Sequence, residues 1–286
     1  MTTPRRTRSA GPTIGESFRE YGRGLAGGLL FSLPLVYTME VWWIGFIARP
    51  ERLLAYLAFI FLLLLGYNRF AGIRHDANWA EVAIDSVEEL GLGVVTAAVL
   101  LFVLGRITAN DSFDEALGKV VIEAGIVAIG FSVGTAQLGT TRPDELGEGP
   151  RGRRDRGPAS QVVLAFCGAV LFAANVAPTE EILMIAVETS PLRLLLVAAL
   201  SLTVASVILF FSDFARSESF VLRRTGHDVL IGSFVTYGVA LVAAGAILWF
   251  FGRFDGHAAD VCVRETVVLG LPGALGASAG RLLLQS

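Results

Sequence analysis

Residues 192–211 read LRLLLVAALSLTVASVILFF, a run of 20 residues in which Arg193 is the only charged side chain. An α-helix needs about 20 predominantly apolar residues to cross the hydrocarbon core of a bilayer, so this run is long enough to span a membrane. It lacks the alternation of polar and apolar side chains that a membrane-spanning β-strand requires. The run therefore predicts a transmembrane α-helix, because the backbone amides of a spanning segment must be hydrogen-bonded within that segment.

Seven further stretches of the chain have the same character. The sequence is 53% apolar and 17% charged, with a mean hydropathy of +0.63, which lies outside the range of ordinary soluble domains. We therefore predict an all-α polytopic membrane protein with about eight transmembrane helices and no separate soluble domain. The predicted spans are residues 24–46, 53–67, 82–103, 116–137, 162–187, 192–211, 229–251 and 263–284.

The charged residues and the cysteines exclude several classes of protein. The net charge is −3 and the basic residues are dispersed along the chain, so nucleic acid is not an expected partner. Cys167 and Cys262 lie in apolar segments without the spacing of a metal site, which predicts two small buried side chains. We expect no cofactor beyond a bound cation such as calcium or manganese.

Lysine and arginine are distributed unevenly between the two sides of the predicted membrane. With eight spans and a cytoplasmic N-terminus, 16 of the 23 Lys and Arg residues fall on the cytoplasmic side. Loops that stay in the cytoplasm carry such an excess of basic residues. We therefore expect a multi-pass protein of the cell membrane, with the N- and C-termini in the cytoplasm.

The second half of the sequence repeats features of the first half. A shift of 141 residues superposes seven identical pairs, and the G-x-S-x-G strings at residues 130–134 and 276–280 match at a shift of 146. The His-Asp dipeptides at 75–76 and 227–228 also correspond, and aligning them places Ser233 at the position of Glu81. We infer an internal duplication. The seven pairs are Phe31/Phe172, Thr38/Thr179, Glu40/Glu181, Pro50/Pro191, Arg52/Arg193, Leu53/Leu194 and Leu54/Leu195.

This duplication divides the chain into two four-helix repeats. Each repeat has an even number of spans, so the two enter the membrane in the same direction and are parallel. A polar stretch rich in Gly and Pro, basic near its end, predicts a cytoplasmic linker between them. The predicted divisions are a cytoplasmic segment at 1–23, a first repeat at 24–138, the linker at 139–160 and a second repeat at 161–286.

Polar residues interrupt the fifth predicted span (162–187), within the stretch FAANVAPTEEILMIAVE at residues 172–188. An acid at the centre of a membrane helix costs about 2.5–3.5 kcal/mol, so two adjacent glutamates need water, a cation or a hydrogen-bond donor. Under the duplication, Glu40 and Glu181 are related positions that we expect to meet at the centre of the protein. The candidate residues for binding a cation or proton are Glu181, Glu40, Glu180, Thr179, Thr38 and Asn175.

Oxygen ligands of this kind suit a hard cation such as Ca²⁺ or Mn²⁺, or a shared proton. The alternative is that Glu40 and Glu181 lie near the outer interface, where they are solvated or paired with Arg49, Arg52 or Arg193.

Further acids define secondary candidates. Glu81, Asp85, Glu88 and Glu89 lie along one face where the third span begins, which suits either an ion vestibule or an amphipathic helix end at the headgroups. Glu123 is an isolated acid in the fourth span, with Lys119 one turn earlier as its expected partner. The secondary candidates are Asp85, Glu88 and Glu123.

Two motifs that resemble enzyme signatures have simpler interpretations. The G-x-S-x-G strings lie inside apolar helices, without the preceding strand of a hydrolase, and predict seams of small residues where helices pack closely. Glu180-Glu181 resembles the Glu-Glu-x-x-x-Arg motif of intramembrane proteases that process prenylated proteins, but Ile185 stands where that motif has Arg. We therefore expect no enzymatic activity.

The Arg-rich N-terminus, the eight spans and the string APTEEI at residues 177–182 resemble an uncharacterised family of predicted bacterial multi-pass integral membrane proteins. This resemblance covers most of the chain and implies topology alone. Residues 175–180 (NVAPTE) are similar to the repeats of cation/calcium exchangers, which implies cation binding by acids on a broken helix. Those exchangers have inverted repeats, whereas the repeats predicted here are parallel.

These observations favour a membrane transporter or channel for a small cation, with proton coupling through intramembrane glutamates. The alternative is a non-transporting membrane sensor or assembly protein in which the acids are structural. The expected partners are the lipid bilayer and a small cation or proton, and a homo-oligomer stays open.

Overall fold

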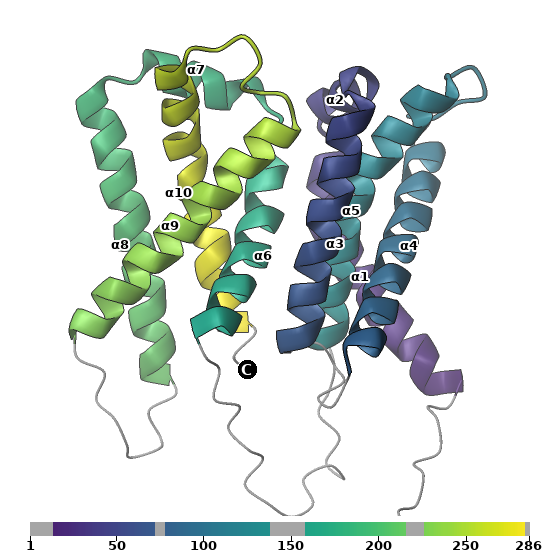
Figure 1. Cartoon of the computed structure of the whole chain (residues 1–286), viewed down its shortest axis with the longest axis horizontal. Helices are drawn as coiled ribbons and strands as arrows, with labels where there is room; N and C mark the ends of the chain where they lie inside the picture. Colours follow the sequence, from purple (N-terminus) through teal and green to yellow (C-terminus); the bar gives the residue numbers. More distant parts are fainter. Residues whose placement is uncertain (1–13, 72–77, 138–157, 216–225, 284–286) are drawn as a thin grey trace, which may run out of the picture.

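The computed structural model is helical throughout the residues that it describes, which are 14–71, 78–137, 158–215 and 226–283. Figure 1 shows the helices in two groups that stand side by side, α1 to α5 and α6 to α10. The helices are α1 (Ile14–Val36), α2 (Met39–Ile47), α3 (Pro50–Ala71), α4 (Trp79–Val103), α5 (Phe113–Gln137), α6 (Pro158–Val176), α7 (Glu180–Glu188), α8 (Pro191–Ala215), α9 (Gly226–Phe250) and α10 (Ala259–Leu283).

The number of helices that can cross a membrane agrees with the prediction. Among the described residues, seven helices are long and apolar enough to span a bilayer, or eight if α1 and α2 form one bent span. The first predicted span is wrong in detail, because α1 and α2 meet at 86° and residues 24–46 do not form one straight helix. Most of the predicted linker lies outside the described residues, and its last residues belong to α6.

Proline and threonine mark the breaks that precede the short helices α2 and α7. Pro34 lies in the last turn of α1, and Pro178 directly precedes Thr179. Proline lacks a backbone donor and disfavours helical conformation in the residue before it. Thr38 and Thr179 have extended backbones (φ −90°, ψ 112° and φ −74°, ψ 146°). The chain therefore leaves the helix at equivalent threonines and begins a new one immediately.

Each group is built around one central helix, α5 in the first group and α10 in the second. α5 is 89% buried over its span and packs against α1 to α4, while α10 packs against α6 to α9. Glycines allow the closest crossings: Gly27 lies against Gly134, and Gly168 lies against Gly276. A Cβ atom on any of these glycines would meet the backbone of the facing helix. The predicted small-residue seams are thus confirmed.

The connections after α4 and α9 end their helices in the same way. Gly105 and Gly252 have φ angles of 65° and 72°, a left-handed conformation that glycine adopts without steric cost. Arg106 and Arg253 then donate their backbone N–H groups to carbonyls five residues earlier, at 2.7 and 2.9 Å. These bonds satisfy carbonyls that would otherwise be unpaired at the helix end. The two caps lie 147 residues apart in sequence.

That spacing changes the alignment of α4 with α9. At a spacing of 147 residues Ser233 pairs with Ser86 rather than with Glu81, and both serines are buried. Each serine is also hydrogen-bonded to the preceding helix, Ser86 to Asn68 at 3.1 Å and Ser233 to Ser206 at 2.9 Å. The alignment through the His-Asp dipeptides pairs different residues of these two helices.

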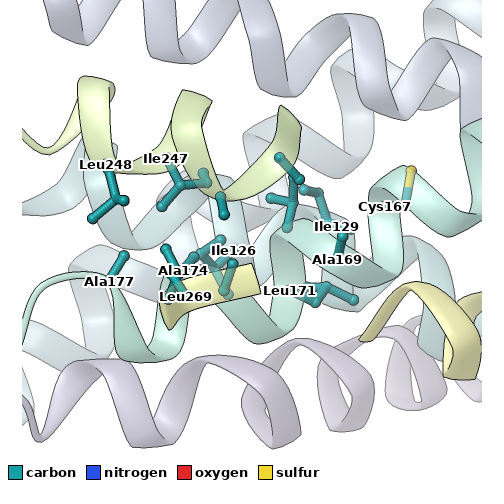
Figure 2. Close-up of a cluster of buried hydrophobic side chains, with 14 of the residues drawn as sticks. Ile126, Ile129, Cys167, Ala169, Leu171, Ala174, Ala177, Ile247, Leu248 and Leu269 are labelled. Atoms are coloured by element: carbon teal, nitrogen blue, oxygen red, sulfur yellow. The ribbon is translucent and has the colours of Figure 1, made fainter. Parts of the chain in front are cut away.

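Aromatic and aliphatic side chains join the two groups. α3 packs against α6 and α9, and α1 and α5 pack against α6. Phe59 of α3 lies 5.8 Å from Phe166 and 5.0 Å from Phe250, measured between ring centroids. Figure 2 shows Ile126 and Ile129 of α5 in one buried cluster with residues of α6, α9 and α10. The same cluster contains Cys167, as predicted, whereas Cys262 is partly exposed.

Candidate functional site

The predicted ligand residues at the helix breaks lie at one end of the bundle. Figure 1 shows α2 and α7 at the upper end, opposite the start of α1 and the end of α10, and we call this the α2/α7 end. α2 packs against α5 and α7 against α10, so Glu40 and Glu181 are carried by different groups. Within the described residues, no group of three His, Cys, Asp or Glu could hold a metal ion.

Several of the predicted ligand atoms already have partners within the protein. The Thr38 hydroxyl donates to the Pro34 carbonyl at 2.8 Å, and the Thr179 hydroxyl donates to the Val176 carbonyl at 2.9 Å. The Asn175 amide donates to a backbone carbonyl one turn earlier at 2.6 Å, and its buried Oδ1 has no partner among the described residues. Each of these hydrogen bonds joins a side chain to a backbone carbonyl three or four residues earlier, next to the helix break.

Glu180 of α7 forms an ion pair with Arg253, which follows α9. Arg253 donates to Glu180 Oε1 at 2.9 Å and to the Thr179 carbonyl at 3.3 Å. The Arg253 guanidinium holds the pKa of the Glu180 carboxyl below its usual value. Glu180 remains 59% exposed, so this pair lies at the surface of the α2/α7 end. Arg253 was not among the partners expected for these acids.

The acidic residues at the start of α4 also have local partners. Asn78 and Glu81 form a capping box, in which Glu81 accepts from the Asn78 N–H at 2.9 Å. Glu88 accepts from the Tyr21 hydroxyl, and Glu89 accepts from the Asn68 amide at 2.7 Å. These hydrogen bonds fit the interpretation of a helix end that is bonded to the neighbouring helices α1 and α3. Asp85 lies partly exposed on the same helix.

Glu123 is the acid that the structure places deepest in the bundle. It lies near the middle of α5, its exposed fraction is 0%, and neither carboxylate oxygen has a hydrogen-bond partner among the described residues. Buried carboxyl groups normally have hydrogen-bond partners or a counter-charge, because burial without them costs several kcal/mol. An ionised acid in this position therefore destabilises the fold unless it is protonated or bound to a ligand.

The expected pairing of Glu123 with Lys119 is wrong. The Lys119 ammonium turns toward the α2/α7 end and donates to Glu115 at 2.6 Å, to Asp111 at 3.1 Å and to the Arg106 carbonyl at 3.0 Å. Glu115 lies one turn earlier in α5, whereas the connection between α4 and α5 brings Arg106 and Asp111 over the start of α5, which spacing along one helix cannot reveal. The hydrogen bond from Thr108 and the ammonium of Lys119 both lower the pKa of Asp111.

A second buried acid, Glu265 in α10, was missed by the sequence analysis. Its exposed fraction is 0%, and His257 Nδ1 lies 3.3 Å from its Oε2 atom. At the spacing of 146 residues, Glu265 corresponds to Lys119 and His257 corresponds to Asp111. At this spacing the basic Lys119 of the first group pairs with the acidic Glu265 of the second. The sequence contains one signal that could have identified Glu265, because the spacing of 146 residues pairs it with another charged residue, Lys119.

The helices, their apolar exposed surfaces and their buried acids define a multi-pass integral membrane protein. Residues 20–284 match the family described as "Putative integral membrane protein (DUF2391)", and the chain belongs to this family. The family resemblance drawn from the sequence is confirmed at this level, which includes contact with the lipid bilayer. No curated protein and no solved structure matches the chain.

Proposed function

We propose that this protein transports a small cation across the membrane in exchange for a proton, and that the Glu123 carboxyl binds the two in turn. The observation that carries the proposal is a fully buried carboxyl group in a central helix, without a partner among the described residues. Acids inside membrane spans typically mark proton or ion pathways. A carboxyl group that binds either a proton or a cation, but not both at once, is suited to exchange one for the other.

The acids at the α2/α7 end have a supporting role in this proposal. Glu40 lies in the first turn of α2, and the exposed Glu181 lies in the first turn of α7. Carboxylates at a surface raise the local concentration of cations without binding one tightly. We therefore assign Glu40 and Glu181 to the entrance and Glu123 to the binding step.

We also propose that the two groups are parallel repeats, each with four spans. The recurring break, cap and glycine crossing support this organisation. The start of α1 and the end of α10 lie at one end of the bundle, and the excess of basic residues supports a cytoplasmic location for that end.

In a cysteine-free background, Glu51→Cys should react with an impermeant maleimide on intact cells. Ala159→Cys should react only after permeabilisation, and the reverse pattern would invert the topology.

The test of transport is cation-dependent proton movement in proteoliposomes that contain the purified protein. Na⁺, K⁺, Ca²⁺, Mn²⁺ and Mg²⁺ are added outside while an enclosed dye reports internal pH. We expect one class of cation to move protons, Glu123→Gln to reduce that flux at least about tenfold, and Glu181→Gln to reduce it by less than about threefold. Glu181→Gln is the matched control because Glu181 is exposed.

Two results would contradict the proposal. If none of these cations moves protons, exchange is excluded for them and a non-transporting sensor or assembly protein becomes the better description. If Glu181→Gln abolishes flux while Glu123→Gln preserves it, the binding step belongs to the helix break instead.

A further inference from the structure

A second buried polar group lies opposite Glu123. Ser32 of α1 has an exposed fraction of 0%, and its hydroxyl has no hydrogen-bond partner among the described residues. α1 and α5 cross closely and run in opposite directions, because α1 leads toward the α2/α7 end and α5 starts there. The register of this crossing determines which residues of the two helices share a level.

Contacts on both sides of Ser32 establish that register. One turn before Ser32, a Cβ atom on Gly28 would lie 3.1 Å from both Cγ1 and the carbonyl oxygen of Val127. One turn after Ser32, Val36 belongs to the same buried cluster as Val120. Residues four apart lie on the same face of a helix. This register places Ser32 and Glu123 in the turn between these two levels.

We propose that Ser32 and Glu123 together bind one dehydrated monovalent cation, in competition with a proton. This inference rests on the proposed function and names its substrate class. The ligands would be two carboxylate oxygens and one hydroxyl oxygen, which are hard donors. Both side chains have an exposed fraction of 0%, so an ion bound by them would have lost its hydration shell.

The charge of the site argues for a monovalent ion rather than Ca²⁺ or Mn²⁺. One carboxylate and one monovalent cation form a neutral pair, whereas a divalent cation would leave a net charge in the bundle interior. A net buried charge is strongly unfavourable in a medium of low dielectric constant. A divalent cation usually binds more than one carboxylate, and within the described residues no group of three His, Cys, Asp or Glu could hold a metal ion.

Few other ionisable groups face this level of α5. Tyr56 of α3 lies beside it, and its hydroxyl donates to the Ile122 carbonyl at 3.0 Å. Lys119 lies one turn away and is bound by acids at the α2/α7 end. From α4, Glu89 lies near Asn68, which Ser132 of α5 also contacts, more than two turns toward the opposite end. The described residues of α1, α2 and α6 that pack on α5 bring no charged group to this level.

The second group contains an internal comparison for this site. At spacings of 141 and 146 residues, Ser32 corresponds to Ala173 and Glu123 corresponds to Leu269. Both of these residues are fully buried. The same crossing is therefore apolar in the second group, so Ser32→Ala is compatible with the packing. Ser278→Ala in α10 is a matched control, because the Ser278 hydroxyl is also buried and has no hydrogen-bond partner among the described residues.

The experiment measures modification of Glu123 by the hydrophobic reagent dicyclohexylcarbodiimide, which reacts with protonated carboxyl groups. Purified protein is labelled at several pH values with increasing NaCl, LiCl, KCl or CaCl₂, and mass spectrometry quantifies the peptide that contains Glu123. We expect Na⁺ or Li⁺ to prevent labelling and Ca²⁺ at equal ionic strength to leave it unchanged. The half-protecting concentration should rise about tenfold for each unit that the pH falls, because one proton competes with one cation.

The variants separate this inference from the proposed function. Ser32→Ala should raise the half-protecting concentration at least about tenfold, whereas Ser278→Ala should leave it unchanged. Stronger protection by Ca²⁺ than by Na⁺, no protection by any monovalent cation, or an unchanged Ser32→Ala would overturn the site. Protection without flux in proteoliposomes would retain the site and refute transport. Flux that depends on Glu123 but is indifferent to Ser32 would retain transport and refute the site.

Discussion

Glu123 is an unfavourable residue for the stability of the fold, and its position in a central helix makes that effect measurable. A buried polar group without a hydrogen-bond partner costs about 1–3 kcal/mol. The corresponding position in the second group is Leu269, which is fully buried. We expect Glu123→Leu to raise the free energy of unfolding by about this amount and to raise the midpoint of thermal unfolding in detergent.

The reciprocal variant is the control for that prediction. Leu269→Glu introduces a carboxyl group into the apolar crossing of α6 and α10 and should lower the unfolding midpoint. A Glu123→Leu protein that is less stable than the wild type would show that Glu123 has a stabilising partner.

The ion pair between Arg253 and Glu180 predicts a response to acid. Arg253 lowers the pKa of Glu180 in the folded protein, so the pair stabilises the fold above the ordinary carboxyl pKa of about 4.3. That contribution is lost as the pH falls through the lowered pKa. Because Glu180 is 59% exposed, we expect less than about 1 kcal/mol. Thermal unfolding of Glu180→Gln should show a smaller loss of stability in acid than the wild type, and an equal loss would exclude this pair as a contributor.

Single residues show how far sequence reasoning reaches. It identified Glu123 as an intramembrane acid, because an acid within a long apolar run can be recognised from the sequence alone. It assigned Lys119 as the partner from helical spacing, and that was wrong because Asp111 approaches from a connection outside the helix. Glu265 was missed since it lies close to the predicted end of a span, where a charge is ordinary.

At the scale of helices, glycine seams set the separation of the central helices from their neighbours. A Cβ atom on Gly168 would lie 3.0 Å from Gly280 Cα and closer still to the Gly276 carbonyl. We expect Gly168→Val to force α6 and α10 apart and to destabilise the protein by about 1–3 kcal/mol. Gly238→Val is the control, since a Cβ there would meet nothing within 4 Å. Equal unfolding midpoints for the two variants in detergent would refute this role for the seam.

The sequence predicted that the helices are interrupted before α2 and α7, but it did not predict the angle between the helices at the interruption. Proline and threonine interrupt helical hydrogen bonding locally, so their effect can be inferred from neighbouring residues. The angle of 86° between α1 and α2 depends on how α2 packs against the start of α5. Gly45 makes that packing possible, because a Cβ atom there would lie 2.7 Å from Lys119 Cα.

For the whole molecule, composition predicted the all-helical class and the number of spans, because both depend on total apolar length. It did not predict that α5 and α10 are central. Hydropathy is similar for α4 and α5, at 1.8 for both spans, yet 22% of one and 89% of the other is buried. Lipid and protein interiors are equally apolar, so hydropathy cannot distinguish a helix that faces one from a helix that faces the other.

The contact between the two groups includes one ion pair at the α2/α7 end. Arg52 of α3 donates twice to the Asp255 carboxylate, at 2.6 Å for each bond, and its guanidinium lies 5.6 Å from the Trp249 ring centroid. Most of the remaining contact is aromatic and aliphatic, without directional bonds. Because the pair is bidentate, it restricts the relative orientation of the groups more than the aromatic contacts do.

If transport requires the two groups to move relative to each other, breaking this pair should change the flux more than the stability. We expect Arg52→Ala and Asp255→Ala each to alter proton flux in proteoliposomes by about threefold or more, with less than about 1 kcal/mol of destabilisation because Asp255 is exposed. The double variant should resemble either single variant, because both remove one interaction. Arg193→Ala is the control, since Arg193 occupies the corresponding position in α8 and forms none of the ion pairs found in the described residues. Independent, multiplicative effects of the two single variants would show that the pair does not couple the groups.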